Sequence, residues 1–307
     1  MANRANIRRG AGKDQHAWTL QESGRFPSHA PHHPLPCPGP SGHRQDARAA
    51  GFAKVVQGSL MAEETEAQSL RLRDCAGPAS FPTNLILLAT VHGDPAGYER
   101  AWRIFQQVQP EVITVEISPF SVRYRQQARR RWRRRLSEAL ATLPPGAEKS
   151  LAVARVAAQA ELPFEYRAAR DWGKLRQVPI KFLDVGRVAR SHLPRFADEL
   201  LSPDNLRLLW EYGAAGTLET FVAAEFRRAR LAREGKLKRA PRPADPDGQS
   251  REHLWARRLK DLVGSGKRLV HLGGWEHLVT WEDGGGLTKL LADLNPQVIL
   301  LDEADKL

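Results

Sequence analysis

The feature that most constrains this chain is a series of five short apolar runs, separated by longer stretches with helical spacing. The runs cover residues 85–89, 112–115, 180–183, 268–272 and 298–301. Runs that are apolar at nearly every position are typical of strands buried on both faces, which occur in parallel sheets covered by helices. The chain is therefore predicted to form an α/β fold with a mainly parallel sheet.

Helical patterns fill the segments between these runs. Residues 95–108 have amphipathic spacing and end just before Pro110, which stops a helix ahead of the next strand. Residues 121–176 and 187–262 have an almost entirely helical pattern. Breaks are expected at Pro144-Pro145, Pro203, Gly213 and the polar loop 241–248. The sheet is thus predicted to carry two large helical insertions.

The first 80 residues differ from the rest of the chain in composition. They are rich in Pro, Gly, His and Arg and have no hydrophobic periodicity. Such a segment cannot bury enough apolar surface to offset its chain entropy, so residues 1–80 are predicted to be disordered and residues 81–307 to form the folded domain. Met61 opens a more ordinary sequence, which leaves open an alternative in which translation starts at Met61 instead of Met1 and the leader is wrongly assigned.

Several protein classes are excluded by composition. The two cysteines, Cys37 and Cys75, cannot form a disulfide framework or a thiolate zinc site. No apolar run approaches the ~18 to 20 residues that span a bilayer, and the N-terminus lacks the apolar stretch of a signal peptide. A soluble, cytoplasmic protein without a transmembrane segment is expected.

Potential ligands follow four of the five predicted strands. They are His92, Glu116, Asp184 and His277. Ligands in open α/β sheets bind outside the carboxyl ends of the strands, so these side chains are expected to converge. Imidazole and carboxylate together suit a divalent ion such as Mn, Co or Zn, and water bound to such an ion is a source of hydroxide near neutral pH. The set therefore favours metal-assisted hydrolysis.

Each candidate also has a plain structural explanation. Asp184 precedes a helical stretch and could equally be a helix cap or a loop anchor. Glu116 is expected to be buried, where an unpaired charge is costly, and this favours a ligand or partner role. His271 lies within a predicted strand, where it is either a core residue or a hydrogen-bond donor to a side chain that binds the metal. His192 and His253 lie in helical stretches and are interpreted as structural.

Short motifs along the chain resemble those of the TraB/PrgY family. In order they are Ala89-Thr90-Val91-His92, Val115-Glu116-Ile117, Glu165-Tyr166-Arg167-Ala168-Ala169, the segment from Arg251 to Ala256, and Gly274-Trp275-Glu276-His277. That family is similar to the TIKI metalloproteases and, more distantly, to erythromycin esterase-like and ChaN-like proteins. The resemblance covers most of residues 83–302, and its specificity comes from the order and spacing of the motifs.

The resemblance implies an α/β fold with two Gly-x-x-His motifs and with Glu and Arg side chains in one site. By position, these residues are His92, Glu116, Glu165, Arg251 and His277. His92 and His277 would be metal ligands, and Glu116 and Glu165 would share the roles of ligand and base. Arg251 would stabilise an oxyanion or bind a substrate carboxylate.

Two positions depart from the family pattern. Ala89 stands where glycine is usual in the first motif, a replacement that is tolerated if the glycine serves close packing. Trp275 is bulky within the last motif, where it either lines a substrate pocket or alters it. Asp184 remains a secondary candidate ligand.

The implied function is a metal-dependent hydrolase of the peptidase type, or a protein that inactivates a peptide signal, with a peptide or small molecule as substrate. Proteolysis belongs to one branch of these families, whereas the TraB/PrgY branch blocks or sequesters a signal peptide. The alternative is a module without turnover that binds a peptide, or binds nucleic acid through Arg-rich helices.

Positive charge is concentrated in two segments. Residues 123–135 contain eight arginines and no acidic residue, and residues 226–242 contain eight basic residues and one acidic residue. Together they exceed the net charge of +12 of the whole chain, so the remainder is slightly acidic. The stretch from Arg129 to Arg135 is a candidate site for an anionic partner, with Trp132 available for stacking. A solvated helix surface and contact with an anionic membrane face are the alternatives.

Overall fold

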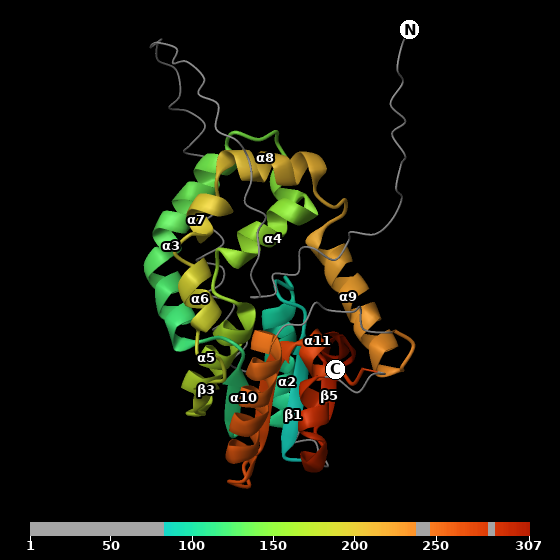
Figure 1. Cartoon of the computed structure of the whole chain (residues 1–307). Helices are drawn as coiled ribbons and strands as arrows, with labels where there is room; N and C mark the ends of the chain where they lie inside the picture. Colours follow the sequence, from blue (N-terminus) through green and yellow to red (C-terminus); the bar gives the residue numbers. More distant parts are fainter. Residues whose placement is uncertain (1–82, 238–245, 282–285) are drawn as a thin grey trace, which may run out of the picture. The chain divides into compact units, whose positions relative to one another are not determined.

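The computed structural model describes residues 83–237, 246–281 and 286–307. The predictions for the leader over residues 1–80 lie outside this range. Five strands form one parallel sheet in the order β3-β2-β4-β1-β5 (Figure 1). The strands are β1 (Leu85–Thr90), β2 (Val112–Val115), β3 (Ile180–Phe182), β4 (Leu269–Gly274) and β5 (Gln297–Leu300). The predicted α/β class is confirmed, and each strand bound lies within two residues of the prediction.

The strand β4 lies at the centre of the sheet, hydrogen-bonded to β1 on one side and β2 on the other. Every residue of β1, β2 and β4 is buried, whereas the edge strands β3 and β5 are only partly buried. This explains why the central runs lack the apolar and polar alternation of a half-exposed strand. The three central strands therefore bring their carboxyl ends together inside the domain.

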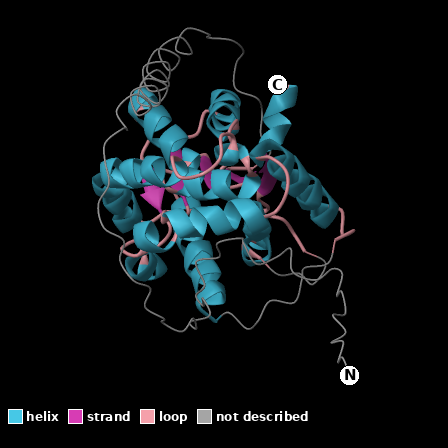
Figure 2. Ribbon diagram, turned by 90° about the horizontal axis from the view of Figure 1, so that it is seen from above, coloured by secondary structure: helices cyan, strands magenta, loops and turns pink. Residues whose placement is uncertain are grey.

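Helices surround the sheet, which lies between them when viewed from above (Figure 2). The α-helices are α2 (Gly97–Val108), α3 (Pro119–Leu140), α4 (Leu151–Gln159), α5 (Phe164–Arg176), α6 (Arg187–His192), α7 (Phe196–Glu199), α8 (Pro203–Tyr212), α9 (Leu218–Arg233), α10 (Pro246–Val263), α11 (Trp275–Leu278) and α12 (Leu287–Leu290). Short 3-10 helices are η2 (Ala147–Lys149), η3 (Ala292–Leu294) and η4 (Leu301–Lys306). Parallel crossovers are right-handed, so the reversal of direction between β3 and β4 places α2 and α10 on opposite faces.

The predicted helix breaks are mostly confirmed. The helix α3 ends at Leu140, before the Pro144-Pro145 pair, and Pro203 begins α8 behind the capping side chain of Ser202. The loop predicted over residues 241–248 ends earlier than expected, because α10 already begins at Pro246. Proline is tolerated in the first turn of a helix, where its missing N–H has no intrahelical partner to lose.

The helices α3, α4, α6, α7 and α8 share a second hydrophobic core, separate from the one that surrounds the sheet. At its centre the Trp132 ring packs against Phe196, with 4.7 Å between the ring centroids. Within the described part of the chain, no helix combines the length and the apolar character needed to cross a membrane.

Candidate functional site at the ends of the central strands

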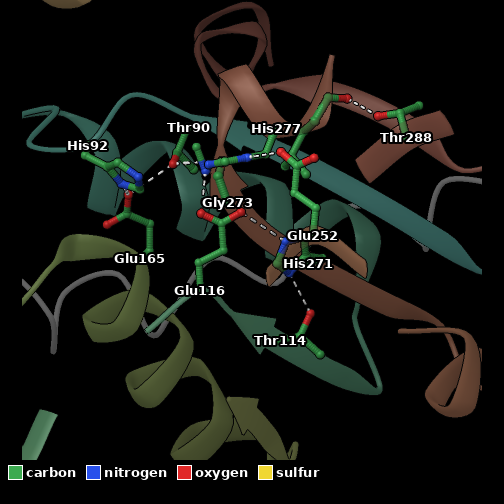
Figure 3. Close-up of polar contacts among 12 residues, drawn as sticks. Thr90, His92, Thr114, Glu116, Glu165, Glu252, His271, Gly273, His277 and Thr288 are labelled. Atoms are coloured by element: carbon green, nitrogen blue, oxygen red, sulfur yellow. Dashed lines mark hydrogen bonds and ion pairs between the residues drawn. The ribbon is translucent and has the colours of Figure 1, made fainter. Parts of the chain in front are cut away.

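Glu116 is the first residue after β2, and its carboxylate crosses toward the end of β4 (Figure 3). The Oε2 atom accepts a hydrogen bond from the backbone N–H of Gly274 at 3.0 Å, and Oε1 lies 3.5 Å from Nε2 of His271. Only 10% of the side chain is exposed. The carboxylate is therefore held between two strands in a largely buried position.

Burial alone would raise the pKa of Glu116, because it penalises the charged carboxylate. The nearby imidazoles outweigh this effect. Contact with His271 and the charges of His277 and His92 lower the pKa of Glu116 to about 2. Glu116 is a buried, permanently ionised carboxylate at neutral pH.

A pH-dependent stability follows from this low pKa. The pKa of Glu116 falls from an ordinary value of 4.5 to about 2 on folding, so its charge stabilises the fold above about pH 4.5 and this stabilisation is lost as the pH falls toward 2. The difference corresponds to about 3 kcal/mol. In urea denaturation, the free energy of unfolding of the wild type should fall more steeply over this range than that of Glu116→Gln. Parallel curves for the two proteins would contradict the assignment.

Gly273 makes room for this carboxylate. A Cβ atom at Gly273 would lie 2.6 Å from Cδ of Glu116 and 2.9 Å from Nε2 of His271, and closer still to Oε1 of Glu116. These separations are below van der Waals contact. The glycine is therefore required by close approach and not by an unusual backbone angle.

His92 follows β1 and pairs with Glu165 on α5. The Nδ1 atom of His92 lies 2.7 Å from Oε1 of Glu165, and the Thr90 hydroxyl lies 3.0 Å from the same oxygen. The imidazole is 64% exposed, whereas the Glu165 side chain is 7% exposed. Glu165 sits in the first turn of α5, where the helix dipole favours a negative charge. The pair thus has a solvent-facing imidazole fixed by a buried carboxylate.

The orientation of the His92 ring directs its other nitrogen toward β4. A Cβ atom at Gly274 would lie 3.0 Å from Nε2 of His92. Because Gly274 also donates its N–H to Glu116, this glycine lies next to both His92 and Glu116. The structure thus brings together three residues predicted from the sequence, namely His92, Glu116 and Glu165.

His277, on α11, forms a second pair of the same kind. Its Nδ1 atom lies 2.6 Å from Oε1 of Glu252 on α10, and its ring meets the Trp255 ring edge-on at 5.4 Å. The side chains of His277 and Glu252 are 25% and 12% exposed. Glu252 was not predicted as a site residue, although its neighbour Arg251 was. The sequence does contain a signal for Glu252, because this carboxylate lies in the same motif as Arg251.

Arg251 and Asp184 each contact a neighbour outside the two histidine–carboxylate pairs. The Arg251 guanidinium lies over the Trp255 ring at 4.8 Å, and the same ring contacts His277. Asp184 is buried, and its Oδ1 atom accepts a hydrogen bond from the N–H of Gly186 at 3.2 Å. This contact matches the alternative of a loop anchor for Asp184.

His271 is fully buried within β4. This burial is expected both for a core residue and for a hydrogen-bond donor to a side chain that binds a metal. Its Nδ1 atom lies 2.9 Å from the Thr114 hydroxyl on β2, and its Nε2 atom faces Glu116. Of the histidines interpreted as structural, His192 ends α6, and His253 lies exposed on α10.

The predicted divalent metal stays a prediction, although the donor atoms at this site are of a kind that binds one. Both His92 and His277 present Nδ1 to a carboxylate, which is the usual environment of a metal-bound imidazole, and Oε1 of Glu116 is buried without a hydrogen-bond partner among the described residues. However, nowhere in the described ranges do three or more His, Cys, Asp or Glu side chains gather closely enough to hold a metal ion. The donor chemistry fits a metal, and the assembled cage remains a prediction.

Trp275, at the start of α11, is buried. Its indole N–H donates to Oε2 of Glu225 on α9 at 3.1 Å, and its ring packs against Trp281. The side chain therefore connects α11 to α9 as part of the core.

Trp132 is also placed differently from the expectation. It was predicted to be available for stacking on a nucleic acid, but its side chain is completely buried. It lies on one face of α3 with Ala128 and Ala139, which are also buried. The helix therefore has a packed face, and its only aromatic residue between two arginine runs points inward.

Most of the described arginines in the two basic segments are already engaged. The ion pairs are Arg129–Glu161, Arg133–Glu161, Arg134–Glu138 and Arg135–Asp198 on α3, and Arg228–Glu225, Arg230–Asp302 and Arg233–Glu303 on α9. By contrast, Arg123, Arg130 and Arg131 are exposed and form no ion pair with another described residue. Residues 238–242 of the second segment lie outside the described ranges.

The ends of β1, β2 and β4 thus carry a buried, ionised Glu116 with two carboxylate-bound imidazoles near it (Figure 3). The Glu165 pair comes from α5 and the Glu252 pair from α10, on either side of the sheet's central strand. Comparison with known proteins adds no assignment, since no family model, no curated protein and no solved structure matches the chain.

Proposed function

We propose that the chain is a TraB-like hydrolase that cleaves a peptide or a small acyl substrate at the strand-end site. The observation that carries this proposal is the pair of imidazoles, His92 and His277, each contacted at Nδ1 by a carboxylate beside the ionised Glu116. A carboxylate at Nδ1 fixes the tautomer of an imidazole and increases its basicity at Nε2. Two such imidazoles suit general acid and base chemistry near neutral pH.

The more exposed imidazole is the better candidate for the base. His92 would accept a proton at Nε2 from an attacking water molecule, and Glu165 would stabilise the imidazolium that forms. The water oxygen would bond to the carbonyl carbon, giving a tetrahedral oxyanion. Protonated His277, stabilised by Glu252, would then donate its proton to the leaving group as the scissile bond breaks. Glu116 would support both imidazoles electrostatically, and Arg251 would bind the oxyanion or a substrate carboxylate.

In the metal-dependent form of this proposal, His92 and His277 would instead bind a divalent ion through Nε2 together with Glu116. That ion, in place of the imidazoles, would supply the activated water molecule. We expect purified wild-type protein to contain Mn, Co or Zn in elemental analysis, and His92→Ala combined with His277→Ala to lose most of it, because two ligands are removed. His192→Ala combined with His253→Ala removes two histidines elsewhere and is the matched control. Equal metal content in all three proteins would contradict the metal assignment.

The hydrolase proposal is tested by a screen of peptide, ester and amide substrates with and without added Mn, Co and Zn. Cleavage that disappears in both His92→Ala and His277→Ala supports it. Tight binding of a peptide without cleavage would instead support the non-catalytic module, in which the same residues only bind. Cleavage that persists in both variants would overturn the proposed site.

Anionic binding along α3 is a second candidate function, favoured by the exposed Arg123, Arg130 and Arg131. Without an exposed aromatic ring to stack on bases, binding would depend on phosphate contacts and show steep salt dependence. For double-stranded DNA, the slope of log K against log salt should lose about 2 in magnitude in Arg130→Gln combined with Arg131→Gln.

The matched control for this titration is Arg129→Gln combined with Arg133→Gln. It removes the same charge, but from side chains that already pair with Glu161. The slope of this control should stay near that of the wild type. Absence of binding at low salt, or equal slopes for both double variants, would leave the arginines as a solvated helix face.

A further inference from the structure

We infer that Thr114 and His271 are positioning residues that hold the Glu116 carboxylate, through a hydrogen bond between Thr114 and His271 and an electrostatic contact between His271 and Glu116. The inference rests on the proposed hydrolase function, because it assigns a role within the same site. Neither residue would touch the substrate. They lie beneath Glu116, within the sheet, and act on the reaction through it.

The register of the sheet places this chain of contacts. Thr114 on β2 is the direct partner of His271 on the adjacent β4, and both residues are completely buried. The Thr114 hydroxyl lies 2.9 Å from Nδ1 of His271, and Nε2 lies 3.5 Å from Oε1 of Glu116. The Nε2 and Oε1 atoms are both buried, and neither has a hydrogen-bond partner among the described residues. Buried polar atoms that stay unpaired are costly, so these two are the natural partners of each other.

The charge of Glu116 and the Thr114 hydroxyl together decide which nitrogen of neutral His271 carries the proton, because the hydroxyl can donate to Nδ1 or accept from it. If neutral His271 were protonated at Nδ1, the lone pair of Nε2 would face the negative charge of Glu116 and repel it. If Thr114 donates its hydroxyl proton to Nδ1, the proton of the ring is at Nε2 and points to Oε1. The second arrangement pairs Nδ1 with the hydroxyl and aims a proton at the carboxylate. The charge of Glu116 therefore favours this tautomer, and Thr114 stabilises it by donating to Nδ1.

The result is a carboxylate fixed at both of its oxygens. Gly274 donates its backbone N–H to Oε2, and His271 faces Oε1 from the opposite direction. The missing Cβ atom of Gly273 leaves the space in which the carboxylate lies. A site that depends on acid and base groups needs such fixed geometry, since a displacement of about 1 Å can cost about 100-fold in rate.

The test combines a spectroscopic readout with kinetics. In wild-type protein labelled with 15N-histidine and measured at mildly alkaline pH, the shifts of His271 should report the tautomer protonated at Nε2. Thr114→Val removes the hydroxyl while keeping the shape, and should weaken this preference and lower kcat by about 10-fold to 100-fold with KM little changed. Thr114→Ser restores a hydroxyl and should restore both.

The outcomes separate this inference from the proposed function. A wild-type His271 protonated at Nδ1 overturns the inference, and this measurement needs no variant to fold. Active protein whose Thr114→Val variant matches the wild type in tautomer and kcat also overturns it. A preference for the Nε2 tautomer, weakened in Thr114→Val and restored in Thr114→Ser, supports the positioning of Glu116 even if no substrate is cleaved, in which case only the hydrolase proposal fails.

Discussion

Glu116→Gln is expected to lower kcat/KM for any substrate that the protein cleaves by about 10²-fold to 10⁴-fold. The substitution keeps the size of the side chain but removes the negative charge that supports both imidazoles. The amide oxygen can still accept the N–H of Gly274, so the loop after β2 should stay in place. The amide NH₂ would then face Nε2 of His271, where the proposed tautomer also carries a proton. The site would lose both its charge and its internal hydrogen bonding.

The measurement is kcat/KM on a cleaved substrate, with thermal unfolding to confirm that the variant is folded. Glu148→Gln is the matched control, since Glu148 is an exposed residue of η2, distant in sequence from the strand ends. Its kcat/KM should equal that of the wild type. Full activity in Glu116→Gln would remove Glu116 from the mechanism and with it the central part of the proposed site.

Gly273→Ala should have the second largest effect, because the new methyl group would occupy the space of the Glu116 carboxylate. Either the carboxylate moves away from β4 or the strand shifts relative to β2. Overpacking of this kind costs about 1 to 3 kcal/mol of stability. We expect lower stability in urea denaturation together with a loss of activity that approaches that of Glu116→Gln.

Gly264→Ala is the control for this change. The added Cβ atom there has no neighbour closer than 3.7 Å, so stability and activity should stay near those of the wild type. Gly274→Ala is an intermediate case, because its Cβ atom would approach only the exposed His92 ring, at 3.0 Å. The order of effects should therefore be Gly273, then Gly274, then Gly264. A harmless Gly273→Ala would mean that the carboxylate does not need its present position.

The sequence predicted the strands well because burial on both faces leaves a plain signal, an unbroken apolar run. It also identified His92, Glu116 and His277 as candidates, since each lies within three residues of the end of a strand. The pairing of His277 with Glu252 could not be read in the same way. Glu252 lies within a long helix, and only the packing of α10 beside α11 brings it to His277.

The basic helix α3 illustrates the opposite case. Its arginines occur on all sides of the helix, so the charge pattern alone does not indicate which side packs against the second core. The indication was in the apolar residues, since Tyr124, Ala128 and Trp132 recur at intervals of four and mark one face. The acidic partners are distant in the sequence, since Glu161 lies between α4 and α5 and Asp198 lies in α7, and a sequence does not reveal such long-range pairs.

The central place of β4 has a consequence for how the site responds to heat or denaturant. This one strand supplies His271, Gly273 and Gly274, and it is bonded to a neighbouring strand along both edges. No loop or lid can detach it without breaking the sheet as well. The backbone amide of Gly274 should therefore exchange with solvent only on global unfolding, so that partial melting of the outer helices leaves His271, Gly273 and Gly274 in place.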